Sequence, residues 1–307
     1  MSKYRILCLD GGGIRGYITA RLLERLQQQH PDCLEGIDLI AGTSTGGLLA
    51  LALASGMSPT QMCDLYANAG QTIFDDSMLD NLTDLGRLVG AQYDTEPLQQ
   101  ELERLFGDLR LGELNTKVAI TSFDLDNQAK TPSRRSWKPK IFHNFAGEDS
   151  DAHLSVAKVA LYTSAAPTYF PSVDGYIDGG VYANNPSLVA LAQAIDQDNA
   201  HTERAELDEV VLLSLGTGIA QSYIEGEALD WGITQWSRHL IGMLLEGVSG
   251  VADYQCQQLL GERYNRLQVE LEAPIALDDP SELPTMQRIV MEQPLDEASD
   301  WLRQHWL

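Results

Sequence analysis

The chain has 307 residues, of which 44% are hydrophobic and 21% charged, and its formal net charge is −23 at pH 7. The charged fraction is typical of globular proteins, which excludes a disordered chain, and the excess of acid disfavours long-range attraction to nucleic acid and to anionic membranes. No apolar run reaches the roughly 18 residues of a membrane-spanning helix, and the apolar run near the start is too short for an export signal, so we expect neither.

Strand-like and helix-like runs alternate along most of the chain. Ser58-Pro59 places serine at the N-cap and proline at the first position of one helix. This order favours an α/β fold in which a mostly parallel central sheet lies between helical layers. The expected elements are strands at 4–9, 37–41, 117–123 and 209–215, and helices at 16–29, from Thr45 and from Pro59.

The last third of the chain reads as mainly helical. Residues 234–264 predict a long helical segment that is broken at Gly247 and Gly250. Residues 275–294 contain several prolines and acids, and we expect a surface connection there before a last short helix. The four cysteines are not at metal-binding spacing, so we expect buried thiols in a reducing, cytoplasmic compartment: Cys8, Cys33, Cys63 and Cys256.

The first expected strand leads into the sequence LDGGGIRG. Gly11, Gly13 and Gly16 fit the G-x-G-x-x-G pattern of dinucleotide-binding loops, but such a loop can also form an oxyanion hole. A dinucleotide site needs an acid about 20 residues further on, at the end of the second strand. That strand ends at Ser44 and has its acid, Asp38, at its start, which disfavours a nucleotide-dependent oxidoreductase.

The second expected strand instead delivers a serine to the edge of the sheet where the glycine loop lies. Gly42, Ser44 and Gly46 form G-x-S-x-G between a strand and a helix, the context of a nucleophile elbow. The amides of Gly12 and Gly13 would then face a carbonyl attacked by this serine. A glycine-rich turn that only packs the helix on the sheet is the alternative. Arg15 would add positive potential or brace the loop, with a surface salt bridge as its alternative reading.

A serine nucleophile needs a base, and the sequence YIDGG offers one. Asp178 ends a short apolar run and is followed by Gly179 and Gly180; burial would raise its pKa towards a useful range, although a plain Asp-Gly turn has the same letters. A histidine base stays open but unsupported, because none of the six histidines has a catalytic-looking turn around it: His30, His143, His153, His201, His239 and His305.

Together these motifs resemble the patatin-like phospholipase family, which carries D-G-G-G-x-R-G, G-x-S-x-G and D-G-G or D-G-A in this order. The resemblance covers residues 1 to about 220 and includes LSLGTG at 213–218. It implies a three-layer α/β/α, patatin-like fold and a Ser-Asp dyad of Ser44 and Asp178. It also implies an oxyanion region at Gly11, Gly12, Gly13 and Arg15.

The implied reaction is hydrolysis of ester bonds in phospholipids or lysophospholipids through an acyl-enzyme, with neither metal nor cofactor. An effector phospholipase activated by a nucleotide second messenger and a weakly active lipid-binding or storage protein are the alternatives. We expect a catalytic domain at 1–220 and a helical C-terminal extension at 221–307 packed on it. The sequence does not predict the oligomeric state.

One stretch departs from the acidic character of the chain. AKTPSRRSWKPK, residues 129–140, contains Arg134, Arg135 and three lysines around Trp137 and no acid. A basic loop with an aromatic tip favours peripheral contact with anionic headgroups, although a solvated connection between strands would look the same. The apolar residues 240–245 are an alternative lipid contact, or part of the core.

Overall fold

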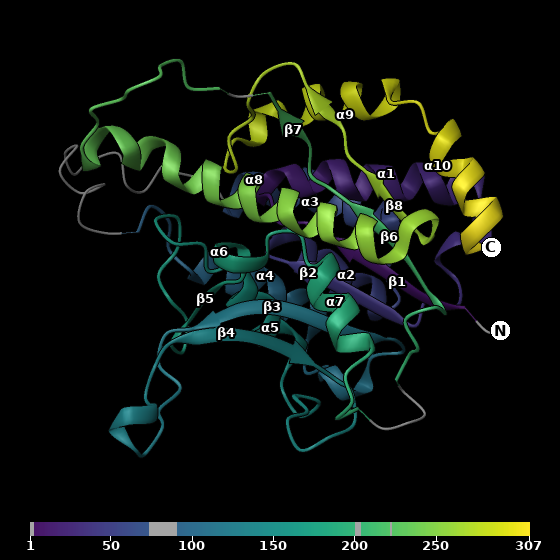
Figure 1. Ribbon diagram of the computed structural model, residues 1–307, viewed down its shortest axis with the longest axis horizontal. Coiled ribbons are helices and arrows are strands. Elements are labelled where there is room, and N and C mark those ends of the chain that lie inside the picture. Colours follow the sequence, from purple (N-terminus) through teal and green to yellow (C-terminus); the bar gives the residue numbers. More distant parts are fainter. Residues whose placement is uncertain (1–2, 74–90, 200–203, 222) are drawn as a thin grey trace.

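Seven strands form one central sheet in the computed structural model, which describes residues 3–73, 91–199, 204–221 and 223–307 (Figure 1). The strand order is β4-β3-β2-β1-β6-β8, and β5 pairs with β3 beside this path. Neighbours from β3 to β8 are parallel, whereas β4 and β5 run antiparallel to β3. The bounds are β1 Tyr4–Leu9, β2 Leu39–Thr43, β3 Lys117–Asp124, β4 Lys138–His143, β5 Tyr176–Asp178, β6 Val210–Leu215 and β8 Tyr264–Leu267, with β7 Ile219–Ala220 and β9 Glu270–Leu271 pairing separately.

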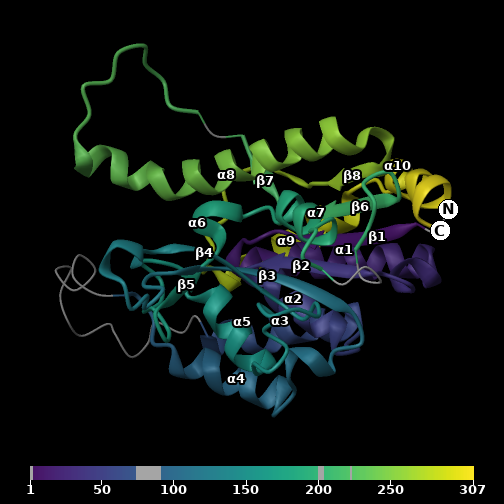
Figure 2. The ribbon, with the colours of Figure 1, turned by 60° about the horizontal axis from the view of Figure 1, so that its bottom comes forward.

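Helices cover both faces of the sheet, as Figure 2 shows. Side chains alternate along β1: Leu7 and Leu9 enter the larger apolar cluster, and Ile6 and Cys8 enter the smaller one. This confirms the prediction of a mostly parallel sheet between helical layers. Seven helices contribute residues to the larger cluster: α1 Gly16–Gln29, α2 Thr45–Ala54, α3 Pro59–Ile73, α4 Glu96–Phe106, α5 Val156–Ser164, α9 Leu283–Glu292 and α10 Asp296–Trp301. The smaller cluster receives residues from α7 Ser187–Ala194 and α8 Ile233–Leu260. The short helix α6 Gly180–Ala183 packs against α8.

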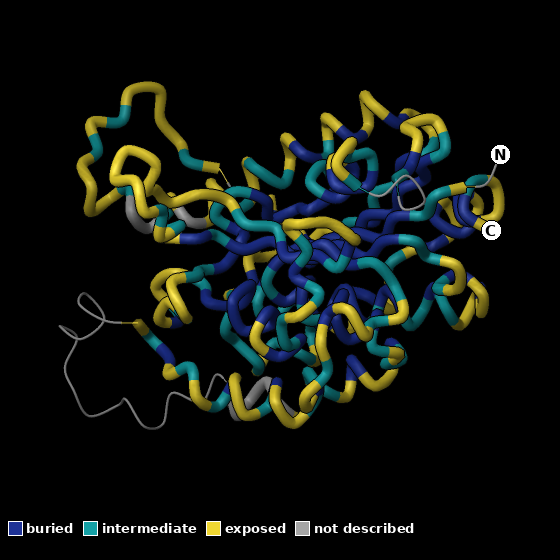
Figure 3. The backbone as a smooth tube through the Cα atoms, turned by 90° about the horizontal axis from the view of Figure 1, so that it is seen from below, coloured by how far each residue is buried: buried dark blue, intermediate teal, exposed yellow. Residues whose placement is uncertain are grey.

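The buried residues are concentrated in the sheet and the helix faces that touch it (Figure 3). All four cysteines lie in this buried part and none forms a disulfide, as the sequence predicted. The amide of Gln61 donates to Ser58 Oγ at 3.3 Å, which confirms Ser58 as the cap of α3. No helix in the described ranges is long and apolar enough to cross a membrane.

The predicted break at Gly247 and Gly250 is wrong, because α8 runs unbroken from Ile233 to Leu260. Nothing lies within 4 Å of a Cβ built at either glycine, so neither is there to make room for a neighbour. An exposed glycine weakens a helix by about 1 kcal/mol without ending it. The helix is held at its C-terminal half, where Ala252, Cys256 and Leu260 recur every fourth residue and are buried.

We expect Gly250→Ala to raise the free energy of unfolding by about 0.5–1 kcal/mol, because the alanine restricts the unfolded chain and its methyl group meets no neighbour. Urea denaturation of the variant beside the parent protein measures the difference. A destabilised variant would contradict the helical placement of this residue.

The surface connection predicted at 275–294 is also wrong, because α9 lies within it and buries Met286 and Val290. Pro284 stands in the first turn of this helix, where proline is tolerated, so this proline does not indicate a loop. The segment after residue 220 is not only helical, since β8 joins the central sheet beside β6. The domain boundary at 220 stays a prediction.

Candidate active site

Ser44 lies between the end of β2 and the start of α2, in a sharply turned backbone with φ 55°. Two glycines make this turn possible. A Cβ on Gly42 would lie 2.2 Å from the carbonyl oxygen of Gly46, and a Cβ on Gly46 would lie 2.1 Å from that of Leu9. Positive φ is costly for a residue with a side chain, so the tight packing around the turn must hold Ser44 in place. The predicted strand–turn–helix context of the G-x-S-x-G motif is therefore present.

The strand pairing brings Asp178 beside Ser44. One edge of β3 pairs with β2 up to Thr121 and then, from Ser122 onward, with β5. Asp178 is the partner of Ser122, so it stands where β2 has just ended and the serine turn begins. The Ser44 hydroxyl lies beside the Asp178 carboxylate and lowers its pKa.

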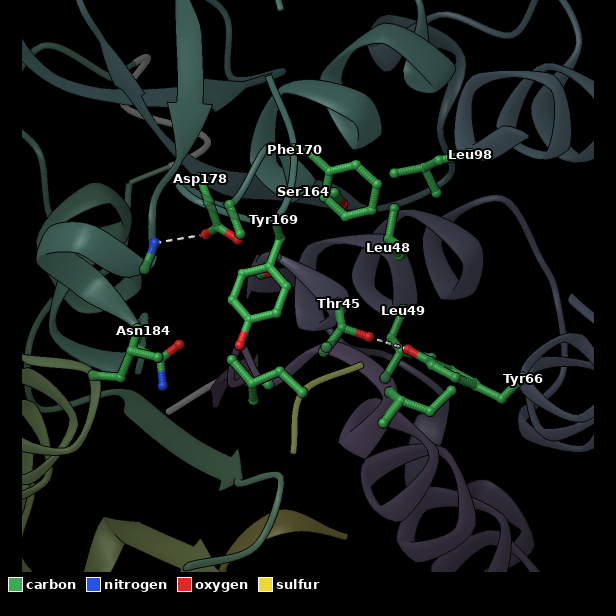
Figure 4. Close-up of a pocket in the computed structure, with 18 of the residues that line it drawn as sticks. Thr45, Leu48, Leu49, Tyr66, Leu98, Ser164, Tyr169, Phe170, Asp178 and Asn184 are labelled. Carbon is green, nitrogen blue, oxygen red and sulfur yellow. Dashed lines mark hydrogen bonds between the residues drawn. The ribbon is translucent and has the colours of Figure 1, made fainter. Parts of the chain in front are cut away.

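The Asp178 carboxylate is buried, with 5% of the residue exposed. Burial raises its pKa to about 6, against the opposing effect of hydrogen bonds from Ser44 and from the Gly180 amide. The amide of Gly180 donates to Asp178 Oδ1 at 2.7 Å (Figure 4). A glycine is required at position 179 for this backbone to lie so close to β3, since a Cβ there would lie 2.3 Å from Thr121 Oγ1. Asp178 is thus ionised near neutral pH, yet more basic than a free aspartate.

The glycine loop presents two free amides beside this pair. Gly12 and Gly13 line the same cavity as Ser44, and neither amide donates to any residue in the described ranges. The Gly11 amide instead donates to the carbonyl of Asn184 at 3.0 Å. Gly11 was expected in the oxyanion region as well, but its N–H is occupied, so the available donors are those of Gly12 and Gly13.

Segments far apart in the sequence hold this loop. Thr217 Oγ1 donates to the Gly11 carbonyl at 2.9 Å, and the Ile14 amide donates to the Leu277 carbonyl at 2.7 Å. Arg266 Nη2 lies 2.5 Å from Asp10 Oδ2, and both side chains are largely buried. Thr217 belongs to the LSLGTG sequence that the motif search found. No pattern in the sequence pointed to the other partners, Asn184, Leu277 and Arg266.

We expect Arg266→Met to lower the free energy of unfolding by about 3–5 kcal/mol, because it leaves the Asp10 carboxylate buried without its cation. Chemical denaturation at pH 7 measures the loss. Arg288→Met is the matched control, since its ion pair with Glu272 is exposed and should contribute less than about 1 kcal/mol. Equal losses in the two variants would contradict an anchoring role for Arg266.

Arg15 is half-buried beneath the loop rather than paired at the surface. Its Nε is buried without a hydrogen-bond partner among the described residues, and burial lowers the pKa of its guanidinium. Glu246 of α8 and Tyr169 are the groups that act on it electrostatically. The alternative of a surface salt bridge therefore finds no partner in the described part of the chain.

Ser44 and Asp178 line a cavity of about 330 Å³. Figure 4 shows Asp178 and Asn184 on one side and Leu48, Leu49, Leu98 and Phe170 on the other. Most of the wall is apolar and comes from α2, α3, α4 and the segment 166–170 that follows α5, while Leu244 and Leu245 of α8 complete it. A chamber of this size and character suits a hydrocarbon chain better than a polar metabolite.

None of the five histidines in the described ranges lines this cavity, and His201 lies outside those ranges. His143 is buried beside Asp149, with 3.3 Å between Nε2 and Oδ2. His239 stacks on Trp231 at the start of α8. Among the described residues, no histidine therefore lies beside Ser44 and Asp178 in the cavity.

The basic stretch starts in the connection between β3 and β4, which projects from the body at the lower left of Figure 1, and ends in the first residues of β4. Trp137 at its end is 73% exposed. Two of its cations are already paired, Arg135 with Asp126 and Lys140 with Asp151 at 2.7 Å. Arg134 is exposed, but the free positive charge is smaller than the sequence suggested.

A family model described as patatin-like phospholipase matches residues 7–191, the part that carries Ser44, Asp178 and the glycine loop. The chain belongs to this family. The resemblance drawn from the motifs is confirmed, and with it a lipid hydrolase in the general sense.

Full-length relatives of this family include a putative sporulation hydrolase, CotR, of Bacillus subtilis, 28% identical over 100% of this chain and 99% of its own length. A potato protein named probable inactive patatin-3-Kuras 1 is 31% identical over 86% of this chain and 78% of its own. Among solved structures, the ExoU–SpcU complex of Pseudomonas aeruginosa matches 99% of this chain and 52% of that chain, at 17% identity and a TM-score of 0.49. Because one relative's name calls it inactive, the activity of this chain has to be argued from its own site.

Proposed function

We propose that this chain is a lipid acyl hydrolase of the phospholipase A or lysophospholipase type, with Ser44 as nucleophile and Asp178 as general base. The observation that carries the proposal is the Ser44 hydroxyl beside the buried Asp178 carboxylate, in an apolar cavity that Gly12 and Gly13 also line. The steps below need no group beyond the chain, the lipid and water.

In the first half of the reaction, Ser44 Oγ attacks the ester carbonyl carbon while its proton passes to the Asp178 carboxylate. The carbonyl oxygen becomes negative and accepts hydrogen bonds from Gly12 and Gly13; one such donor is typically worth about 3 kcal/mol in the transition state. The bond to the leaving alcohol then breaks. That oxygen takes the proton from Asp178, which leaves an acyl group on Ser44 and a free lysolipid or glycerol derivative.

In the second half, water attacks the acyl ester and gives its proton to Asp178. The tetrahedral intermediate collapses, the fatty acid leaves, and the proton returns to Ser44 Oγ. The apolar chamber next to Ser44 would hold the acyl chain throughout, since burying each CH₂ group contributes about 0.8 kcal/mol.

A lipid panel assayed for released fatty acid tests this proposal, with Ser44→Ala as the blank. We expect release from at least one phospholipid or lysophospholipid by the parent protein and none above background by the variant. Release that is equal in both would exclude Ser44 chemistry. The weakly active storage protein, which the name of the potato relative favours, predicts little release from any lipid by either protein.

We also propose that the loop at 129–140 contributes to peripheral contact with anionic membranes, because Arg134 and Trp137 are exposed at its end. The triple variant Arg134→Ala, Arg135→Ala, Trp137→Ala is expected to bind phosphatidylglycerol vesicles about tenfold more weakly, at about 1 kcal/mol for each cation near the surface. Cosedimentation measures the binding. Equal binding by parent and variant would leave the loop as a solvated connection.

A further inference from the structure

The exposed side of α8 carries a long apolar stripe. Its residues follow one another at helical spacings of three, four and seven, which places them on one side of the helix. The exposed fractions of Leu240, Met243 and Leu244 are 45%, 50% and 54%. Among the described residues, none in this helix before Ala252 is buried. We define the outer stripe as Ile233, Trp236, Leu240, Met243, Leu244, Val251 and Tyr254.

Three polar groups of α8, those of Asp253, Glu246 and Ser249, lie off this stripe. Asp253 accepts a hydrogen bond from the Tyr264 hydroxyl at 2.8 Å, and Glu246 acts electrostatically on Arg15, so both acids turn away from the stripe. Ser249 donates to the Leu245 carbonyl and accepts from Asn184 Nδ2 at 3.1 Å, on the side that faces the site. In a chain of net charge −23, no charged residue belongs to the stripe.

The stripe is continuous with the cavity that holds Ser44. Leu244 is a member of the stripe and also lines the cavity, next to Leu245. The side-chain amide of Asn184 donates to Ser249 of α8, and the backbone carbonyl of the same Asn184 accepts from the Gly11 amide. Asn184 therefore connects this part of α8 to the glycine loop. An acyl chain that leaves an apolar phase at the stripe therefore meets apolar side chains all the way to the nucleophile.

We propose that the outer stripe of α8 docks on the surface of a neutral or zwitterionic lipid layer, with the helix lying in the interface and Leu244 at the entrance for the acyl chain. The stripe spans 22 residues, about 30 Å of helix, and Figures 1 and 2 show that the first half of α8 stands away from the sheet. An apolar face without charge suits insertion beside uncharged headgroups. This inference rests on the proposed function, because the docked lipid is the substrate phase of the same site.

Two serine substitutions outside the cavity test the docking. Leu240→Ser with Met243→Ser removes two stripe residues that do not line the cavity. The matched control is Leu259→Ser with Met291→Ser, which removes an exposed leucine and methionine, 48% and 60% exposed, away from the stripe. Flotation with phosphatidylcholine vesicles measures binding, hydrolysis of a soluble short-chain ester measures the site, and light scattering measures the mass in solution.

We expect at least tenfold weaker vesicle binding by the stripe variant, unchanged binding by the control, and soluble-ester hydrolysis retained by both. Equal vesicle binding by the two variants, or no binding by the parent, would overturn the docking. A parent dimer that the stripe variant converts to a monomer, with vesicle binding unchanged, would show that a second copy covers the stripe, which also overturns it. If the parent binds vesicles through the stripe but cleaves no ester, the proposed function fails while the docking stands.

Discussion

Asp178→Asn is expected to lower kcat by about 10⁴-fold while making the folded protein more stable at pH 8. The amide keeps the size of the carboxylate and can still accept from the Gly180 amide, but it cannot take the proton of Ser44. Loss of the carboxylate in other serine hydrolase triads has an effect of about this size. The buried carboxylate that serves as base therefore also lowers the free energy of unfolding when it is ionised.

The sign of the stability change follows from the raised pKa. A free aspartate titrates near 3.8, and Asp178 titrates at about 6 when folded, so the folded state holds the proton more tightly. Its stabilising effect is fully present below pH 3.8 and is lost as the pH rises through 6. The pKa difference of about two units means that the ionised carboxylate lowers the free energy of unfolding at pH 8 by roughly 3 kcal/mol. Asparagine carries no charge and removes this loss.

Urea denaturation of the variant and the parent at pH 8 and at pH 4 measures this change, with Asp149→Asn as control because Asp149 is exposed and outside the cavity. We expect the variant to be more stable at pH 8 and the gap to narrow towards pH 4. The activity of the parent should fall about tenfold for each pH unit below 6. A variant with substantial turnover would reassign the base.

Ser44→Ala is expected to lower kcat by about 10⁶-fold, because Ser44 is the one hydroxyl among the described cavity residues that acts on the Asp178 carboxylate. It should also raise the pKa of Asp178 above its present value, since the hydrogen bond from Ser44 lowers that pKa. Ser164→Ala is the matched control. Ser164 lines the same cavity, and its Oγ has no partner in the described part of the chain.

A fatty-acid release assay on the lipid that the parent cleaves best measures the three proteins together. We expect Ser164→Ala to keep activity within a few-fold of the parent while Ser44→Ala loses it. Loss in both variants would indicate that the shape of the cavity, rather than the hydroxyl of Ser44, had been damaged.

The strands β1, β2, β3 and β6 and the three motifs were predictable because their patterns are local. The glycines around Ser44 are required by close contacts near the strand–turn–helix unit, so the G-x-S-x-G motif predicts the turn that the structure shows. The burial of Asp178 was also foreseeable, as it ends a short apolar strand. The place of β5 beside the end of β2 was not, because it depends on β3 being longer than its neighbour.

The partners that hold the glycine loop could not be predicted, because they come from distant segments. Arg266 lies 256 positions after Asp10, and Leu277 belongs to a stretch that was read as a connection. The occupied amide of Gly11 is likewise a consequence of the position of Asn184. The predicted break in α8 was wrong for another reason. Its glycines are exposed, and an exposed glycine weakens a helix without ending it.

Reaction with a fluorophosphonate probe, followed by mass spectrometry of the labelled peptide, tests the central claim most directly. The probe phosphorus takes the place of the ester carbonyl and stays on an activated serine. We predict one label on Ser44 in the parent and in Ser164→Ala, no label in Ser44→Ala, and slow labelling in Asp178→Asn. A label on any other residue, or none in the parent, would contradict the claim that Ser44 is the nucleophile of this protein.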